Sequence, residues 1–340
     1  MKAEDEMMNG AKELRYYYEE LATPKSYKNF EKKYYDFLTK VEENNVDYKK
    51  SEGFYIDPDG VTEFYNHLTC FLNHQEKKYK KSYLFMPPKA APLTTTKITV
   101  IQNGEMLFRL TSDQFGFSAD KRIYKYNNDK YNYYKCYYGK YPLANLLFLT
   151  QGEDQTKREE IKKQIARYVK NTRTIGGSFL WPVPPKGRCN CIYNTSRGIG
   201  SYLEDRVDLT LLEIKHALDG SYDKGEHTSD ILYRQYQNGK RYIKEWLKHF
   251  DSFDSYVEYF MLEDFVEKKD GKYVPINIIN GEPLNDDYLK KYREQYKKSS
   301  LQNLTEKEIR AMLEYLEKKI LERSAKMENI IKLYYEENHG

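Results

Sequence analysis

The chain has 340 residues, of which 39% are hydrophobic, and its 56 basic and 52 acidic residues leave a net charge of +4. This length suffices for about two domains or one large one, and the 35 tyrosines add large apolar rings to its core. The near balance of charge excludes a surface that attracts polyanions as a whole, so any nucleic-acid site has to be a local basic patch.

The cellular location is predicted from three features. The N-terminal stretch MKAEDEMMNGAKELR is polar and acidic, without the apolar core of a secretion signal. No apolar run approaches the roughly 18 residues of a membrane span. The cysteines at positions 70, 136, 189 and 191 lack the spacing of a disulfide framework. We therefore expect a cytoplasmic protein with free thiols and no membrane partner.

Three regions are expected along the chain: a helical region 1–92, a mixed region 93–200 with β-hairpins, and a helical region 201–340 that could be continuous with the second. Residues 10–48 read as two helices, and VTEFYNHLTCFL (61–72) as another. In KITVIQNGEMLFRL (97–110), the Asn-Gly pair between two β-prone runs predicts a hairpin. The fold class predicted from this order is α+β.

The stretch IYKYNNDKYNYYKCYYGKY (123–141) predicts a second hairpin that turns at Asn127–Asp129. Its tyrosines fall on both faces of a strand, which favours ordinary packing in a core. Exposed rings beside lysines would instead provide a platform on which bases stack. The candidate stacking residues are Tyr131, Tyr133 and Tyr137.

The second half of the chain is expected to be mainly helical. Helices are predicted over 153–171, 201–220, 230–250 and 255–268, followed by a turn-rich connection 268–284 with at most one edge strand. A last helix opens with the capping box Thr305-x-x-Glu308 and carries an apolar stripe for about thirty residues. Such a helix has to lie across the domain or against a second subunit.

The segment 172–218, TRTIGGSFLWPVPPKGRCNCIYNTSRGIGSYLEDRVDLTLLEIKHAL, carries the clearest motifs. Gly176-Gly177 in a β-like run permits close approach of the backbone to another group, or a β-bulge. The loop NTSRGIG (194–200) precedes an expected helix, whose N-terminus with an arginine and glycines could bind an anion. The run EDRVDLTLLE then places charges among apolar residues.

These residues define a candidate phosphate-directed site. The candidate catalytic residues are Arg197, Asp205, Asp208 and His216, with an aspartate as base or as ligand of a divalent cation such as Mg²⁺, and His216 as proton donor. The candidate phosphate-binding residues are Arg173, Thr174, Gly176, Gly177, Asn194, Gly198 and Arg206. A structural alternative stays open: acids in a first turn complement the helix dipole, and an Arg–Asp pair can join helix to loop.

The ordered succession TIGG…P, N-x-x-RG, DR-x-DLTL-x-x-I and YVEYFMLEDFV resembles an uncharacterised bacterial domain family of unknown function, over residues 172–285. The chain departs from the family pattern at Ser178, at residues 194–196 before Arg197, and at Val207. The resemblance implies a shared fold, and it assigns no catalytic residue.

Other sites are not favoured. A zinc site formed by His67, Cys70 and His74 with Cys189 and Cys191 would need a C-x-C pair, which is poor geometry for two ligands, so no metal site is predicted. The nucleophile elbow of a serine hydrolase is missing.

The function predicted from the motifs is a nucleic-acid- or nucleotide-directed bacterial effector in conflict with phages. It would be a nuclease or an enzyme of nucleotidyl or ADP-ribosyl transfer. Two alternatives are a binding module for RNA (more than DNA) or a nucleotide, and an interaction protein that contacts a partner or a second copy through its last helix. Whether the protein is an enzyme stays open.

Overall fold

The computed structural model describes residues 62–88, 97–114, 153–172, 174–183, 207–225, 241–284 and 305–339, together with residues 233, 236 and 237. The two helices predicted within 10–48 and the hairpin predicted within 123–141 lie outside these residues.

A four-stranded antiparallel sheet forms the β part of this region, in the order β1-β2-β3-β4. Its strands are β1 (Leu84–Met86), β2 (Ile98–Gln102), β3 (Glu105–Gln114) and β4 (Ser178–Val183). Asn103 and Gly104, with φ angles of 52° and 80°, join β2 to β3, as two left-handed residues do in a tight hairpin. The hairpin predicted from the Asn-Gly pair is confirmed.

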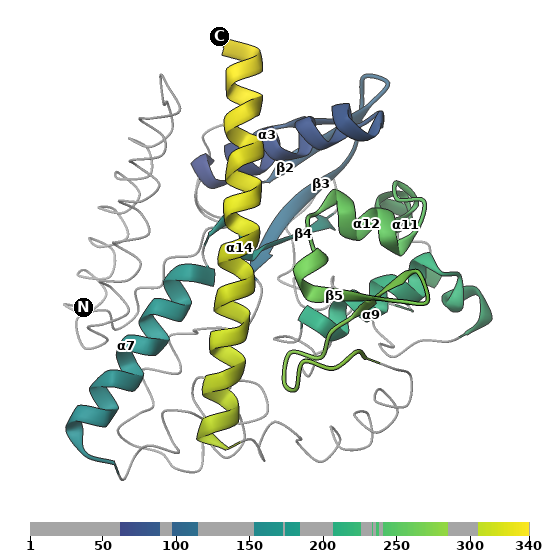
Figure 1. The fold of residues 1–340 in the computed structure, drawn as a ribbon. Helices are drawn as coiled ribbons and strands as arrows, with labels where there is room; N and C mark the ends of the chain where they lie inside the picture. The colour runs from purple at the N-terminus through teal and green to yellow at the C-terminus, as the bar shows by residue number, and fades with distance from the viewer. Residues whose placement is uncertain are drawn as a thin grey trace, which may run out of the picture.

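Six α-helices accompany the sheet in the described residues: α3 (Thr62–Tyr79), α7 (Gln155–Thr172), α9 (Val207–Leu218), α11 (Arg241–Lys248), α12 (Phe253–Tyr259) and α14 (Glu306–His339). Figure 1 shows α14 crossing the whole molecule, with α7 beside its N-terminal part and α3 crossing it nearer the C-terminus. The α+β class and the long last helix are confirmed. The capping box is present too, because Glu308 N–H donates to Thr305 Oγ1 (3.2 Å) and Thr305 N–H donates to Glu308 Oε2 (2.7 Å).

One hydrophobic core runs through all of the described elements, from Phe64 on α3 to Ile331 on α14. Alternate residues of the sheet, among them Phe85, Val100 and Phe108, point into it. Residues of the three regions expected from the sequence therefore share a single core.

Helix α3 closes the outer edge of the sheet. Asn73 Nδ2 donates to the carbonyl oxygen of Phe85 (2.9 Å), and Asn73 Oδ1 accepts from its N–H (3.0 Å). Glu76 Oε2 accepts from the N–H of Tyr83 (2.8 Å), and residues 87 and 88 are prolines, which have no N–H. Side chains of α3 thus bond the backbone groups through which an edge strand would pair with another chain.

The helix predicted over 255–268 is wrong beyond Tyr259. Met261 takes a left-handed conformation (φ 53°), and Leu262 N–H donates to the Val257 carbonyl oxygen (2.9 Å), which ends α12. A two-stranded hairpin follows, formed by β5 (Val266–Lys269) and β6 (Lys272–Pro275). Its turn is Asp270-Gly271, with φ angles of 51° and 78°.

The buried tyrosines predict alkaline unfolding. Burial raises the pKa of Tyr83 to about 12, and burial together with Glu76 raises the pKa of Tyr259 well above its usual value. Burial likewise raises the pKa of Tyr222 and Tyr256. Because these phenols stay protonated in the fold but ionise near pH 10 when unfolded, their contribution to stability is complete below pH 10 and is lost as the pH rises through the raised pKa of each, which is about 12 for Tyr83.

Each such tyrosine lowers the free energy of unfolding by about 1.4 kcal/mol per pH unit in that window. We expect the circular dichroism of the helices to be lost between about pH 10 and 12, together with a cooperative rise of tyrosinate absorbance. Tyrosine ionisation that is complete near pH 10 while the helical signal persists would contradict this prediction.

Candidate nucleic-acid interface

The TIGG motif forms a buried turn between α7 and β4. Ile175–Gly177 make a 3-10 turn, closed by a hydrogen bond from Gly177 N–H to the Thr174 carbonyl oxygen (2.9 Å). Thr174 Oγ1 also donates to the carbonyl oxygen of Asn171 (2.7 Å), near the end of α7. All residues from Thr174 to Val183 are buried. The turn that the sequence offered as a phosphate-binding loop thus lies inside the protein.

Gly176 contacts α14 at very short range. Its N–H donates to Ser324 Oγ (2.8 Å), and a Cβ at this position would lie 2.3 Å from Ser324 N and 2.4 Å from the Ile320 carbonyl oxygen. Only a residue without a side chain fits there. Of the two roles predicted for the Gly176-Gly177 pair, close approach or a β-bulge, the structure shows the close approach, and the group approached is the backbone of α14.

Arg323 of α14 ties the same turn to α12. Arg323 is 2% exposed, and its guanidinium donates to three backbone carbonyl oxygens: Nε to Phe260 (2.9 Å), and Nη1 to Gly176 (2.5 Å) and Ser178 (2.9 Å). Burial lowers the pKa of Arg323 to about 10, so it stays charged at neutral pH. The backbone carbonyl oxygens of the motif therefore accept hydrogen bonds from the buried, positively charged side chain of Arg323, which compensates for its burial.

Asp208 also joins two elements of the fold through a hydrogen bond to a backbone group. It lies in the first turn of α9, where a carboxylate complements the helix dipole, and its side chain is buried. Asp208 Oδ2 accepts from the N–H of Ile278 (3.1 Å), in the turn that follows β6. His216 lies half-buried in the last turn of the same helix. The catalytic roles of Asp208 and His216 stay predictions.

Thr174, Gly176 and Gly177 belong to the turn under α14, whereas Asp208 and His216 belong to α9, which packs against β6, α11 and α12. The other predicted site residues lie outside the described residues, and their roles are untested. They are Arg173, Asn194, Arg197, Gly198, Asp205 and Arg206, with the candidate stacking residues Tyr131, Tyr133 and Tyr137.

Helix α7 carries an unusual share of the positive charge. Six of its 18 residues are basic and two are acidic, a net charge of +4 (6 − 2), which equals the net charge of the whole chain. The other 322 residues (340 − 18) therefore sum to zero. This helix is therefore the candidate for the local basic surface that a polyanion-binding site needs, and two of its basic residues, Lys157 and Arg167, pair with Glu306 and Glu317 of α14.

The packing of α7 leaves basic side chains at the surface. Ile161, Gln164, Tyr168 and Thr172 recur at helical spacing and are buried. Lys163, Arg167 and Lys170, at positions i, i+4 and i+7, form what we call the basic stripe. Lys163 and Arg167 are exposed and Lys170 is half-buried.

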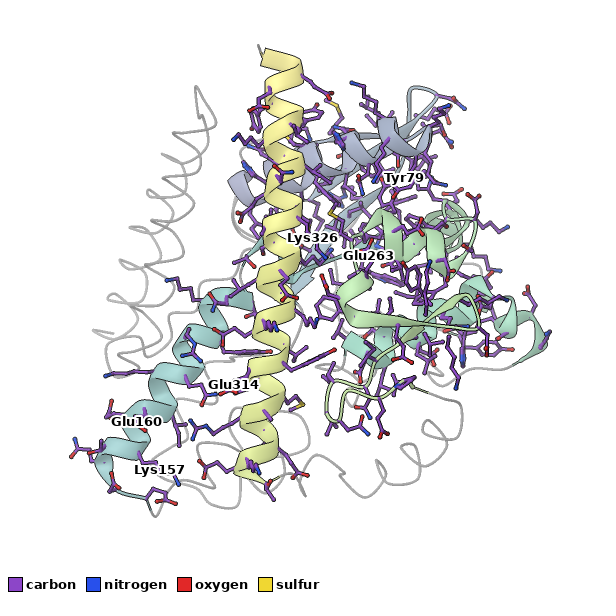
Figure 2. All side chains as sticks on the ribbon, viewed as in Figure 1. Tyr79, Lys157, Glu160, Glu263, Glu314 and Lys326 are labelled. Atoms are coloured by element: carbon purple, nitrogen blue, oxygen red, sulfur yellow. The ribbon has the colours of Figure 1, made fainter. Side chains whose placement is uncertain are left out.

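Contacts with α14 hold the helix in place. Arg167 Nε donates to Glu317 Oε1 (2.9 Å), and Arg310 Nε donates to Gln164 Oε1 (2.9 Å). At the start of α7, Lys157 lies 3.3 Å from Glu306. Figure 2 shows Lys157 and Glu160 on the first turns of α7, with Glu314 on the adjacent part of α14.

The comparison with family models gives a match over residues 142–311, which is half of the chain. The chain belongs to the DUF6994 family, a family of unknown function. Neither the search of curated proteins nor that of solved structures found a match.

The DUF6994 region includes α7, the TIGG turn and Asp208, but Arg323 and Ser324 lie beyond residue 311. The turn is therefore completed by a part of α14 outside the matched region. Among the described residues, no group of three or more His, Cys, Asp or Glu side chains is placed to hold a metal ion, and no helix is long and apolar enough to cross a membrane.

Replacing Asp208 tests its structural role. Asp208→Ala leaves the buried N–H of Ile278 without this acceptor, which should lower the free energy of unfolding by about 1–3 kcal/mol. Asp223→Ala, which removes an exposed carboxylate next to α9, should change it by less than about 0.5 kcal/mol. Urea unfolding followed by circular dichroism measures both, and equal stability of the two variants would refute the role.

Proposed function

We propose that this protein binds nucleic acid through the basic stripe of α7, with RNA as its first expected ligand. The observation that carries the proposal is the concentration in one helix of a charge equal to the net charge of the whole chain. Phosphate contacts by lysine and arginine supply most of the affinity of sequence-independent binding, and they need a local surface rather than a basic protein.

The spacing of the basic stripe supports this ligand. Lys163 and Lys170 are seven residues apart, which is about 10 Å along a helix axis. Consecutive phosphates of a strand in B-form DNA advance by about 3.4 Å along its axis, so the stripe spans about three phosphate steps, and slightly more in an A-form RNA duplex. A row of cations of this length favours a polymer of phosphates over a single phosphate group.

The contacts of the motif residues favour binding over catalysis. The backbone N–H and carbonyl of Gly176 bond to Ser324 and Arg323, and Asp208 bonds to the backbone of Ile278. These groups stabilise the fold. The conflict between bacteria and phages remains the proposed setting.

Salt-dependent RNA binding tests the proposal. Substituting Lys163, Arg167 and Lys170 by Gln should weaken binding of single-stranded RNA and reduce the slope of log K against log salt by about 2.1, at about 0.7 for each of three phosphate contacts. Because Arg167 also pairs with Glu317, a thermal melt establishes that the variant is folded. The matched control is Lys268→Gln, Lys269→Gln and Lys272→Gln, which removes three exposed lysines from the β5–β6 hairpin. This control should bind like the wild type. Fluorescence anisotropy with labelled RNA at several salt concentrations measures both slopes.

Wild-type protein that does not bind RNA or DNA at low salt would overturn the proposal, as would equal losses in the two triple variants. Incubation of the same RNA with Mg²⁺ distinguishes the enzymatic alternative. RNA cleavage that is lost in Arg197→Ala, with the fold retained, would replace a binding function by a catalytic one.

A further inference from the structure

A second basic cluster lies at the end of α3, where residues 77–81 read Lys-Lys-Tyr-Lys-Lys. No other window of five residues in the chain holds four basic ones. Figure 1 shows α3 and α7 meeting α14 toward opposite ends. The cluster is therefore separate from the basic stripe.

The backbone at this cluster is unusual for a lysine. Helix α3 ends at Tyr79, and Lys80 has a φ of 52°, while Lys81 N–H donates back to the Glu76 carbonyl oxygen (2.9 Å). Glycine is the usual residue at this capping position, because a side chain there costs about 1 kcal/mol. Met261 has the same conformation at the end of α12, but its side chain packs against the core. Lys80 is exposed, so packing does not account for it.

Two of the four lysines have carboxylate partners. Lys77 Nζ lies 2.8 Å from Glu337, and Lys81 Nζ lies 3.6 Å from Asp251 and donates to the carbonyl oxygen of His249.

The other two lysines are exposed. Lys78 Nζ lies 4.9 Å from the centre of the Tyr79 ring, and Lys80 has no ion pair with any residue that the structure describes. Lys248, which precedes His249, is exposed as well. Protein surfaces that bind nucleic acid combine exposed cations with aromatic rings on which bases stack.

We propose that Lys78 and Lys80 form a second contact to the same nucleic acid that the basic stripe binds, so that the ligand is an extended nucleic acid and not a free nucleotide. This inference rests on the proposed function. The contacts on α14 set the length: Arg167 pairs with Glu317, and Lys77 pairs with Glu337. These carboxylates are 20 residues apart on one helix, so the two clusters are separated by about 30 Å along α14, which corresponds to about nine base pairs at the rise of B-form DNA and to slightly more in an A-form RNA duplex.

The dependence of affinity on length tests the inference. Labelled RNA duplexes of about 6 and about 18 base pairs fall below and above the predicted span. Wild-type protein should bind the long duplex at least about tenfold more tightly than the short one in low salt. Lys78→Glu with Lys80→Glu should weaken binding of the long duplex about tenfold and leave that of the short one within about twofold.

The control is Lys269→Glu with Lys272→Glu, which reverses two exposed charges on the β5–β6 hairpin and should leave both affinities within about twofold. Two results would overturn this inference but leave the proposed function intact. The first is equal affinity of wild-type protein for the two duplexes. The second is equal affinity of the Lys78/Lys80 variant and wild-type protein for the long duplex. Absence of binding to either duplex would overturn both. Thermal melts establish that the variants are folded.

Discussion

Gly176→Ala is expected to lower the free energy of unfolding by about 3 kcal/mol or more, or to prevent folding. The added Cβ would lie 2.3–2.4 Å from Ser324 N and the Ile320 carbonyl oxygen. Both atoms belong to the backbone of α14, so no side-chain rotation can relieve the contact. To admit the methyl group, the helix would have to move away from the turn and lose the hydrogen bond from Gly176 N–H to Ser324.

Gly104→Ala is the matched control for this prediction. Gly104 has a φ of 80° and open space where a Cβ would be, so its substitution adds backbone strain of about 1 kcal/mol without a clash. Denaturant unfolding of wild type and both variants, followed by circular dichroism, gives the comparison. Similar losses in the two variants would show that α14 does not approach the turn as closely as described.

Arg323→Met should lower the free energy of unfolding by about 3 kcal/mol. Methionine fills much of the volume but donates no hydrogen bond, so the carbonyl oxygens of Phe260, Gly176 and Ser178 lose a donor within a buried site. The loss of a costly buried charge offsets part of this effect.

Lys318→Met is the control for Arg323→Met, because its side chain is 73% exposed on the outer side of the same helix. Its effect should stay within about 0.5 kcal/mol. Arg323→Met protein as stable as wild type would mean that the three carbonyl contacts contribute no net stability, and that the turn is held by packing alone.

Local signals made some of the fold predictable. Asn103-Gly104 specifies a left-handed turn by its residue types, and Thr305 with Glu308 marks a helix start, so both could be read without knowledge of distant contacts. Asp270-Gly271 gives the same kind of signal as Asn103-Gly104. The aromatic pattern before it favours a helix, so the sequence indicates an edge strand within 268–284 but not the strand β5 that pairs with it.

The partner of the TIGG motif could not be predicted. Gly176 indicated close approach to some group, but that group, Ser324, is 148 residues away along the chain. One signal was available in the last helix. Arg323 interrupts an apolar stripe that continues with Leu316, Ile320 and Met327, and an arginine on a buried stripe needs several acceptors. A turn offers such acceptors, because its backbone carbonyl oxygens are not all paired within a helix or a sheet.

The sequence indicates the candidate interface only in part. The charge balance showed that a nucleic-acid site has to be local, and the basic composition of residues 155–172 could have located it. Which basic residues of α7 reach the surface depends on how the helix packs against α14, and the sequence does not state this. The run of lysines at 77–81 was visible in the sequence, whereas the left-handed backbone of Lys80 was not.

Hydrogen exchange of the amides from Thr174 to Ser178 gives the most direct test of whether the TIGG turn packs against α14 or binds a ligand. If the turn is locked under α14, the Gly176 amide, which donates to Ser324, exchanges only by global unfolding, and saturating RNA slows it by the same factor as the other core amides that exchange in this way. Exchange within seconds in the free protein, followed by strong protection when RNA binds, would show instead that the motif is open and contacts the ligand.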